Sequence, residues 1–165
     1  MNLLAIDFLE TIYNKEKETS LLGKWIRFKD IKDLFKKYED AFQISELGTS
    51  EKGTPIYTLK IGSGEKKILL WSQMHGNEST GTKALFDLFN CLLLSKQSEI
   101  NTILKSCTLL FVPMLNPDGA EVYTRVNGNN IDLNRDVIDR KAKESKLLRA
   151  LLEEFNPQFC FNLHD

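Results

Sequence analysis

The sequence predicts an α/β domain with a mixed, largely parallel sheet flanked by helices. Residues 67–74, 107–115 and 158–163 are nearly continuous apolar runs, which are typical of buried strands. Residues 79–95 and 141–155 place apolar side chains at helical spacing between those runs. Strands that alternate with helices favour parallel pairing, because each helix returns the chain to the same end of the sheet.

The N-terminal part of the chain is expected to add helices and two short strands. Helical spacing predicts helices over residues 3–13 and 28–40, and the polar run at 14–20 predicts a loop. Short strands are predicted over residues 42–47 and 55–62, on either side of a turn-prone segment. The Gly-Ser-Gly-Glu segment that follows predicts a hairpin into the first buried strand.

Composition indicates one globular domain without a strong charge bias. The 165 residues are 42% hydrophobic and 27% charged, and 22 Lys and Arg are interspersed with 23 Asp and Glu. Such a balance makes nucleic acid and anionic membrane surfaces poor candidate partners. The chain opens with Asp7 and Glu10 among its apolar residues rather than with a secretory signal, so we expect a cytoplasmic protein.

The three cysteines are expected to be buried free thiols. Cys91, Cys107 and Cys160 lie in apolar runs, are odd in number and have no Cys-x-x-Cys spacing. Neither a disulfide framework nor a cysteine-based zinc site is therefore predicted.

Polar clusters follow the carboxyl ends of the three buried strands. His-Gly-Asn-Glu follows the first strand, Asn-Pro-Asp-Gly the second, and His164-Asp165 the last. In open α/β sheets, ligands bind in the crevice beyond these strand ends. We therefore expect three separate loops to meet at one site.

The residues at these strand ends favour a metal centre. His75 and Glu78 are two residues apart across Gly76, and the second of the two histidines in the chain is His164. Three protein ligands with one open position describe catalytic zinc. Taken singly, the first pair could form a surface turn and His164 could be a core histidine, but their common position favours a ligand set.

Residues 115–136 form a polar segment that is too long for an ordinary connection. Long loops of this kind are either functional or disordered, and this one spaces Arg125, Asn134 and Arg135 as potential anion binders. The alternative for Arg135 is a surface ion pair with Asp136. We favour a function near the proposed metal.

At these residues the sequence resembles the zinc carboxypeptidase family typified by carboxypeptidase A. The resemblance rests on HGNE, NPDG, Arg125, DLNR and His164, in this order, and on the segment 44–62. It covers the chain from about residue 25 to its end. It implies that residues 25–165 are the N-terminal part of a catalytic domain, apparently truncated, and that an N-terminal helix and loop occupy residues 1–24.

The resemblance implies a role for each matching residue, in an enzyme that hydrolyses the C-terminal peptide bond of peptides with a free C-terminal carboxylate. One Zn²⁺ per chain would be bound by His75, Glu78 and His164, and Asp132 would orient the first histidine. Arg125 would stabilise the developing oxyanion. The substrate carboxylate would be bound by Asn134 and Arg135, whose planar guanidinium suits a carboxylate.

The family's general-base glutamate lies beyond the third zinc ligand, as do the residues that close over the substrate. The chain ends at Asp165, so the resemblance implies an incomplete domain that lacks its general base. Glu153 and Glu154 are available carboxylates, but they lie on a predicted amphipathic helix and are expected to be solvated.

Two other functions stay open at this point. The aspartoacylase and succinylglutamate desuccinylase group, which hydrolyses N-acyl amino acids, also resembles this fold and shares HGNE and DLNR. NPDG and Asp165 favour the peptidase, because Asn would be expected after the third ligand in the acylase group. A zinc- or carboxylate-binding module without catalysis is the second alternative, because loss of a general base typically costs about 10² to 10⁴ in rate.

Overall fold

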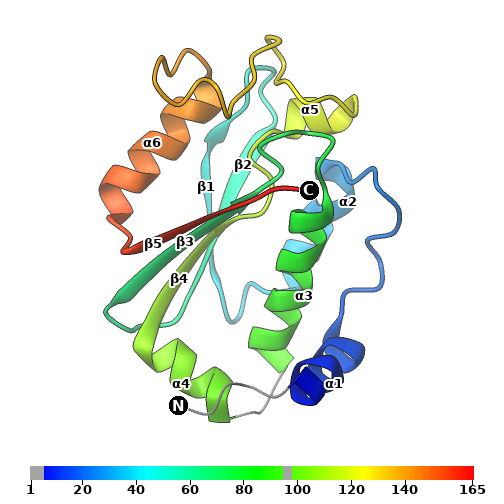
Figure 1. The fold of residues 1–165 in the computed structure, drawn as a ribbon, viewed down its shortest axis with the longest axis vertical. Helices are drawn as coiled ribbons and strands as arrows, with labels where there is room; N and C mark the ends of the chain where they lie inside the picture. The colour runs from blue at the N-terminus through cyan, green and yellow to red at the C-terminus, as the bar shows by residue number, and fades with distance from the viewer. Residues whose placement is uncertain (1–5, 95–97) are drawn as a thin grey trace.

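A five-stranded mixed sheet forms the centre of the computed structural model, which describes residues 6–94 and 98–165 (Figure 1). Its strands lie in the order β1-β2-β4-β3-β5. Antiparallel pairs join β1 to β2 and β2 to β4, whereas β3 runs parallel to both β4 and β5. The predicted mixed α/β sheet is therefore confirmed. The strands are β1 (Gln43–Thr49), β2 (Pro55–Ile61), β3 (Lys66–Ser72), β4 (Cys107–Val112) and β5 (Phe159–Leu163).

Helices cover both faces of this sheet. In Figure 1, α6 lies on one face, and α3 together with α2 lies on the other. The short α5 lies beyond the carboxyl end of β4. The helices are α1 (Ile6–Glu16), α2 (Phe28–Ile31), the 3₁₀ helix η1 (Lys32–Lys37), α3 (Thr80–Leu94), α4 (Ser98–Ser106), α5 (Pro117–Glu121) and α6 (Lys143–Phe155).

Strand β4 is buried on both faces, as its apolar sequence predicts. Leu109 and Phe111 belong to the core beneath α3, whereas Leu110 and Val112 belong to the core beneath α6. Successive side chains of a strand point to opposite faces, so one continuous apolar run supplies both cores. This double burial holds the middle of the sheet, and with it the strand ends that carry the polar clusters.

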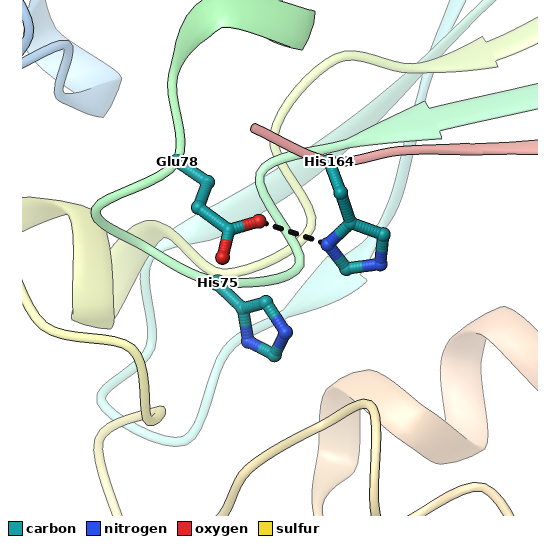
Figure 2. A group of neighbouring side chains, drawn as sticks. All are labelled: His75, Glu78 and His164. Atoms are coloured by element: carbon teal, nitrogen blue, oxygen red, sulfur yellow. Dashed lines mark hydrogen bonds and ion pairs between the residues drawn. The ribbon is translucent and has the colours of Figure 1, made fainter.

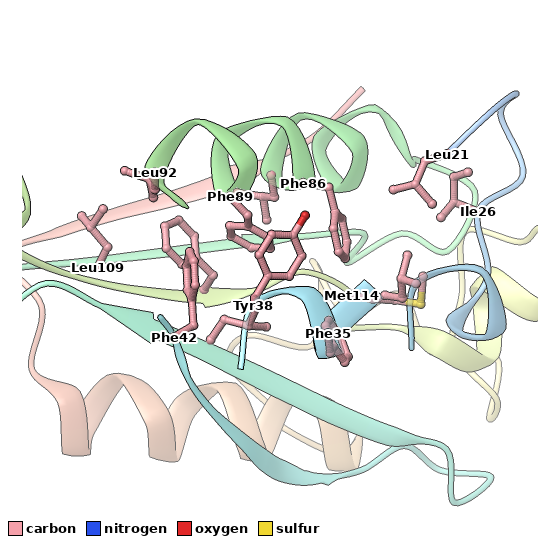
Figure 3. Packing of buried hydrophobic residues seen from close by; sticks show 14 of the residues in the cluster. Leu21, Ile26, Phe35, Tyr38, Phe42, Phe86, Phe89, Leu92, Leu109 and Met114 are labelled. Carbon is pink, nitrogen blue, oxygen red and sulfur yellow. The ribbon is translucent and has the colours of Figure 1, made fainter. Parts of the chain in front are cut away.

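Aromatic side chains fill the core between α3 and the sheet (Figure 3). Phe89 makes edge-to-face contacts with Tyr38 and Phe111, with ring centroids 5.6 and 4.9 Å apart. Tyr38 is fully buried, and its hydroxyl donates a 2.7 Å hydrogen bond to Asn90 of α3. Edge-to-face pairs are favourable because the positive ring edge meets the negative ring face. These contacts fix α3 against β4.

The predicted hairpin between β2 and β3 is wrong. Strand β4 lies between them, so the Gly-Ser-Gly-Glu segment crosses the end of the sheet instead of joining neighbours. Gly64 packs against the chain at the start of β4: a Cβ there would lie 1.9 Å from the carbonyl carbon of Ser106. Its N–H donates to the carbonyl of Cys107. The glycines permit this close backbone approach. A glycine-rich segment in the sequence does not distinguish such an approach from a hairpin turn.

The helices also differ in part from the predictions. The first helix extends to Glu16 rather than ending at residue 13, because Lys15 and Glu16 are good helix formers; residues 3–5 lie outside the described chain. The segment predicted as a helix over 28–40 divides into α2 and η1. Helices α4 and α5 were not predicted. Within the described residues, no helix is long and apolar enough to span a bilayer.

Burial of the cysteines is only partly as predicted. Cys91 and Cys107 are partly buried, and no disulfide forms among the described residues. Cys160 is exposed, so the prediction of a buried thiol is wrong there. The physical reason is that β5 is an edge strand of the described sheet, which pairs only with β3.

The segment after α1 is anchored to α3 through Glu18. The carboxylate of Glu18 accepts hydrogen bonds from the hydroxyl of Ser20, from Lys37 and from Asn90 at 2.8, 3.2 and 3.3 Å. Its own N–H donates to Asp87. Although burial raises the pKa of Glu18, the bonds from Ser20, Lys37 and Asn90 outweigh it and lower this pKa from 4.5 to about 2.

This shift predicts a pH-dependent contribution to stability. Because the folded-state pKa is depressed, Glu18 stabilises the fold fully above about pH 4.5, and the contribution is lost as the pH falls toward about 2. Glu18→Gln should therefore lower the urea midpoint of unfolding at pH 7. Near pH 2 the midpoint of the variant should approach that of the wild type. The exposed Glu39→Gln variant should match the wild type throughout. A Glu18→Gln deficit that does not change with pH would contradict the prediction.

Candidate metal centre

The three polar clusters meet at one edge of the sheet, as their strand positions predict. Strands β3, β4 and β5 are parallel, so their carboxyl ends lie together. The turn after β3 carries His75 and Glu78, and His164 follows β5 directly. Figure 2 shows these three side chains converging from two separate segments of the chain.

The grouped side chains form a compact donor set. Ligand atoms of His75, Glu78 and His164 all lie within 4.8 Å of one another. Nδ1 of His164 is 2.8 Å from Oε2 of Glu78, and the two imidazole centroids are 5.0 Å apart. The side chain of His75 is 1% exposed and that of His164 is 32% exposed. Two imidazoles and a carboxylate with one open side fit Zn²⁺.

Close backbone packing shapes the turn that holds His75 and Glu78. The N–H of Glu78 donates to the carbonyl of His75 at 3.0 Å, which closes the turn. Gly76 packs against α5, where an added Cβ would lie 2.0 Å from the carbonyl carbon of Gly119. The buried amide of Gln73 donates to the Gly76 carbonyl at 2.8 Å. The turn is therefore fixed from both sides before any ligand binds.

Arg125 and Asp132 border the candidate ligand group of His75, Glu78 and His164. Nε of Arg125 is 2.9 Å from Oδ2 of Asp132, and its Nη1 is 3.4 Å from Oε1 of Glu78. Oδ1 of Asp132 lies 3.7 Å from Nδ1 of His75, and the carbonyl oxygen of Arg125 lies 3.4 Å from the same nitrogen. The structure thus brings two of the predicted site residues to the group, on the side of His75.

The electrostatics of the group favour an ionised Asp132 and a neutral His75. Burial lowers the pKa of His75, and the opposing influence of the Glu78 and Asp132 carboxylates does not reverse this. Although burial raises the pKa of Asp132, the hydrogen bond from Arg125 and the nearby charges hold it below its ordinary value. A neutral imidazole is the form that binds a metal.

Asn134 and Arg135 lie two and three residues after Asp132, and within the described residues their side chains make no hydrogen bond or ion pair with the two histidines or Glu78. Their backbone N–H groups donate to the carboxylate and the carbonyl of Asp132, respectively, at 3.0 Å. Arg135 is exposed, and within the described residues its guanidinium makes no hydrogen bond or ion pair. The alternative pairing with Asp136 does not form, because that carboxylate accepts the backbone N–H groups of Lys141 and Ala142.

Several residues that support the site were not assigned from the sequence. The amide of Asn116 donates to the Met74 carbonyl and accepts from the N–H of Gly119, which ties α5 to the end of β3. Asp118 is buried, where it accepts a 2.7 Å bond from Ser50. The NPDG motif signals these positions, but their structural roles depend on contacts with distant segments. Glu153 is exposed and paired with Arg149, as predicted for a solvated helix face.

Comparison with known proteins identifies the family. A family model described as zinc carboxypeptidase matches residues 28–156. The chain belongs to the zinc carboxypeptidase family. The match confirms the resemblance drawn from HGNE, NPDG and DLNR.

Curated relatives of this family are longer than the chain. Carboxypeptidase SOL1 of Arabidopsis thaliana is 31% identical over 120 residues, which cover 68% of this chain and 24% of the relative. Carboxypeptidase D of Mus musculus is 29% identical over 122 residues, covering 63% of this chain and 9% of the relative. The chain therefore spans about a quarter or less of these relatives.

Solved structures of zinc carboxypeptidases share the fold. A metallo-carboxypeptidase from Pseudomonas aeruginosa superposes with a TM-score of 0.77 at 22% identity, covering 83% of this chain and 39% of that chain. Carboxypeptidase A from Helicoverpa armigera has a TM-score of 0.70 at 17% identity, covering 97% and 52%, respectively. These likenesses establish the architecture of the sheet and its flanking helices.

The packing of Gly76 predicts a severe effect of one added methyl group. Gly76→Ala should lower the free energy of unfolding by about 3 kcal/mol or more, because its Cβ would meet backbone that cannot rotate away. Gly53→Ala is the control: its Cβ would meet nothing within 4 Å, so only its φ of +86° costs about 1 kcal/mol. Urea unfolding measures both, and equal losses would refute the close-packing explanation.

Proposed function

We propose that residues 25–165 form the zinc-binding part of a metallocarboxypeptidase catalytic domain, which removes the C-terminal residue of peptides. The observation that carries this proposal is the convergence of His75, Glu78 and His164 within 4.8 Å at the carboxyl ends of parallel strands. Membership of the zinc carboxypeptidase family supports the same reaction class.

Zinc would be held by His75, Glu78 and His164, with one position open for water or substrate. Bound there, it would polarise the scissile carbonyl and lower the pKa of a coordinated water. Asp132 favours a proton on the facing Nδ1 of His75, because an ionised carboxylate 3.7 Å away attracts the N–H. This leaves the other ring nitrogen unprotonated.

Arg125 would stabilise negative charge that develops on the carbonyl oxygen. Its guanidinium reaches Glu78 and is oriented by the 2.9 Å bond to Asp132, so it is positioned before substrate binds. A preorganised donor needs little rearrangement during the reaction, and one such donor is typically worth about 3 kcal/mol.

Asn134 and Arg135 would bind the terminal carboxylate of the substrate. Arg135 is exposed on the segment that also supplies Asp132, close in sequence to the metal group. A planar guanidinium can bind a carboxylate with two parallel hydrogen bonds. Selection of a free C-terminus, rather than an internal bond, would follow from this contact.

Non-catalytic zinc binding is the second candidate, and one observation favours it for this chain by itself. The carboxylates beside His75 and His164 are already engaged: Glu78 in the ligand set, Asp132 with Arg125, and Asp165 with the N–H of Thr80 at 3.0 Å. None of these described carboxylates is left to act as a general base.

The ligand assignment predicts how zinc content responds to substitution. After zinc loading and gel filtration, elemental analysis should find one zinc per wild-type chain. His164→Ala and Glu78→Gln should lose it, because two ligands no longer form a stable site. The exposed Glu153→Gln variant should retain it. Zinc retained by folded His164→Ala would refute the assignment.

The same zinc-loaded protein separates the candidate functions. Release of the last amino acid from N-blocked peptides supports the carboxypeptidase proposal. Turnover of N-acyl amino acids without release of amino acids from peptides would instead favour a hydrolase of N-acyl amino acids, like the aspartoacylase group. Bound zinc with no turnover of either substrate would support non-catalytic binding by this chain.

Asp132 has a separate and smaller predicted effect. Asp132→Asn should weaken zinc binding by about 10- to 100-fold without abolishing it, because the variant loses the charge that orients His75 but keeps all three ligands. Competition with a chelating dye measures the change, and the exposed Asp139→Asn variant is the control. Unchanged zinc affinity in Asp132→Asn would refute the proposed role of Asp132 in orienting His75.

A further inference from the structure

Two large aromatic side chains lie exposed near the candidate metal centre. Trp25 is 49% exposed and Tyr123 is 40% exposed, although both rings are apolar over most of their surface. The ring centroids are 6.0 Å apart at an interplanar angle of 56°. Arg27 lies over the Trp25 ring, 5.0 Å from its centroid, and its Nε pairs with Asp30 at 3.1 Å. We refer to Trp25 and Tyr123 as the aromatic pair.

Trp25 lies beside the turn that carries His75 and Glu78, which we call the metal-binding turn. Hydrogen bonds to the residues before and after Trp25 hold it there. The hydroxyl of Ser79, directly after Glu78, donates to the carbonyl of Lys24 at 2.6 Å. The amide of Gln73 donates to the carbonyl of Ile26 at 2.8 Å, and the same nitrogen bonds the Gly76 carbonyl. Both neighbours of Trp25 are therefore fixed to the turn that carries two of the proposed zinc ligands.

The indole ring itself is also oriented. Its Nε1–H donates a 2.8 Å hydrogen bond to the carbonyl of Ala120, at the end of α5 where Gly76 packs. The polar edge of Trp25 is thus satisfied by protein, and its exposed part presents ring surface. An oriented aromatic ring loses little conformational freedom when a ligand binds to it.

Tyr123 connects this surface to Arg125. It lies two residues before Arg125 and adopts a left-handed backbone conformation, with a φ of 57°. The N–H of the intervening Thr124 donates to the Gly119 carbonyl at 2.9 Å. Left-handed backbone is uncommon for a bulky residue and persists where surrounding contacts impose it. The residue in this conformation is Tyr123, whose ring lies beside that of Trp25.

The aromatic pair and the proposed carboxylate-binding residues are both linked to Arg125. Tyr123 lies two residues before Arg125, and Arg125 bonds Asp132, whose backbone carbonyl accepts the N–H of Arg135. A peptide whose carboxylate is bound by Asn134 and Arg135 would cross the metal group. Its preceding residues would then run toward α5 and Trp25.

We propose that Trp25 and Tyr123 form a subsite for an aromatic side chain of the peptide substrate, upstream of the bond that is cleaved. This subsite rests on the proposed function for the direction of the peptide. Trp25 lies outside residues 28–156, which match the family model, and Tyr123 lies inside them. The exposed ring faces, their fixed orientation and their continuity with the metal-binding turn select this occupant.

A peptide series tests the subsite. The probes are N-acetylated pentapeptides of alanine in which one phenylalanine moves from the second to the fifth position from the C-terminus. Zinc-loaded wild-type protein should bind one of these about 10-fold more tightly than the all-alanine peptide, through an aromatic contact that adds to ordinary burial. Trp25→Ala and Tyr123→Gly should each reduce that preference to near unity without changing the affinity for the all-alanine peptide.

Two features of the chain sharpen this experiment. Glycine at position 123 removes the ring without straining the left-handed backbone, so that variant keeps the test valid if Trp25→Ala does not fold. Tyr13→Ala is the matched control, because Tyr13 is also exposed with a cation over its ring, that of Lys17. The phenylalanine preference should survive in Tyr13→Ala. In a Trp71→Phe background, fluorescence from Trp25 should change when the preferred peptide binds.

The test judges the subsite and the proposed function separately. Arg135→Ala should weaken the binding of every peptide, including the all-alanine one. Unchanged binding would refute the proposed carboxylate contact. A missing phenylalanine preference, or one that survives both Trp25→Ala and Tyr123→Gly, would refute the subsite whatever Arg135→Ala does. Concentration-dependent self-association that Trp25→Ala abolishes would instead assign the aromatic pair to a contact between copies of the chain.

Discussion

Parallel pairing of β3 with both β4 and β5 is the constraint on which the candidate site depends. The pairing places three carboxyl ends together, so that loops distant in sequence deliver His75, Glu78 and His164 to one point. Burial of β4 on both faces holds this alignment. Without that register the ligands would be separated along the sheet, because each residue of slip moves a strand by about 3.3 Å.

A second constraint is the backbone contact between Gly76 and Gly119. It lets α5 approach the metal-binding turn more closely than any side chain would permit. Gln73 and Ser79 then fasten the N-terminal segment to the same turn. The site is therefore built from a rigid turn with protein on both sides, which is the arrangement that positions ligands without further ordering.

The protonation states of His75 and Asp132 suit zinc binding, with a neutral imidazole and an ionised carboxylate. Burial keeps the imidazole of His75 neutral, and Arg125 holds Asp132 ionised while reaching Glu78. One guanidinium thus contacts two carboxylates. Membership of the zinc carboxypeptidase family and this arrangement both support the proposed zinc-dependent hydrolysis, and the exposed Trp25 belongs to the proposed aromatic subsite.

The sequence by itself determined the α/β class and the three strands whose ends carry the polar clusters, and it predicted His75, Glu78 and His164 as metal ligands, because buried strands and their polar ends leave local patterns. Only the tertiary structure decided that β4 separates β2 from β3, that Cys160 lies on an edge strand, and that Trp25 is tied to the metal-binding turn. These outcomes depend on contacts between residues far apart in the chain. Local periodicity carries no information about such contacts, since the same turn or apolar run is compatible with several neighbours.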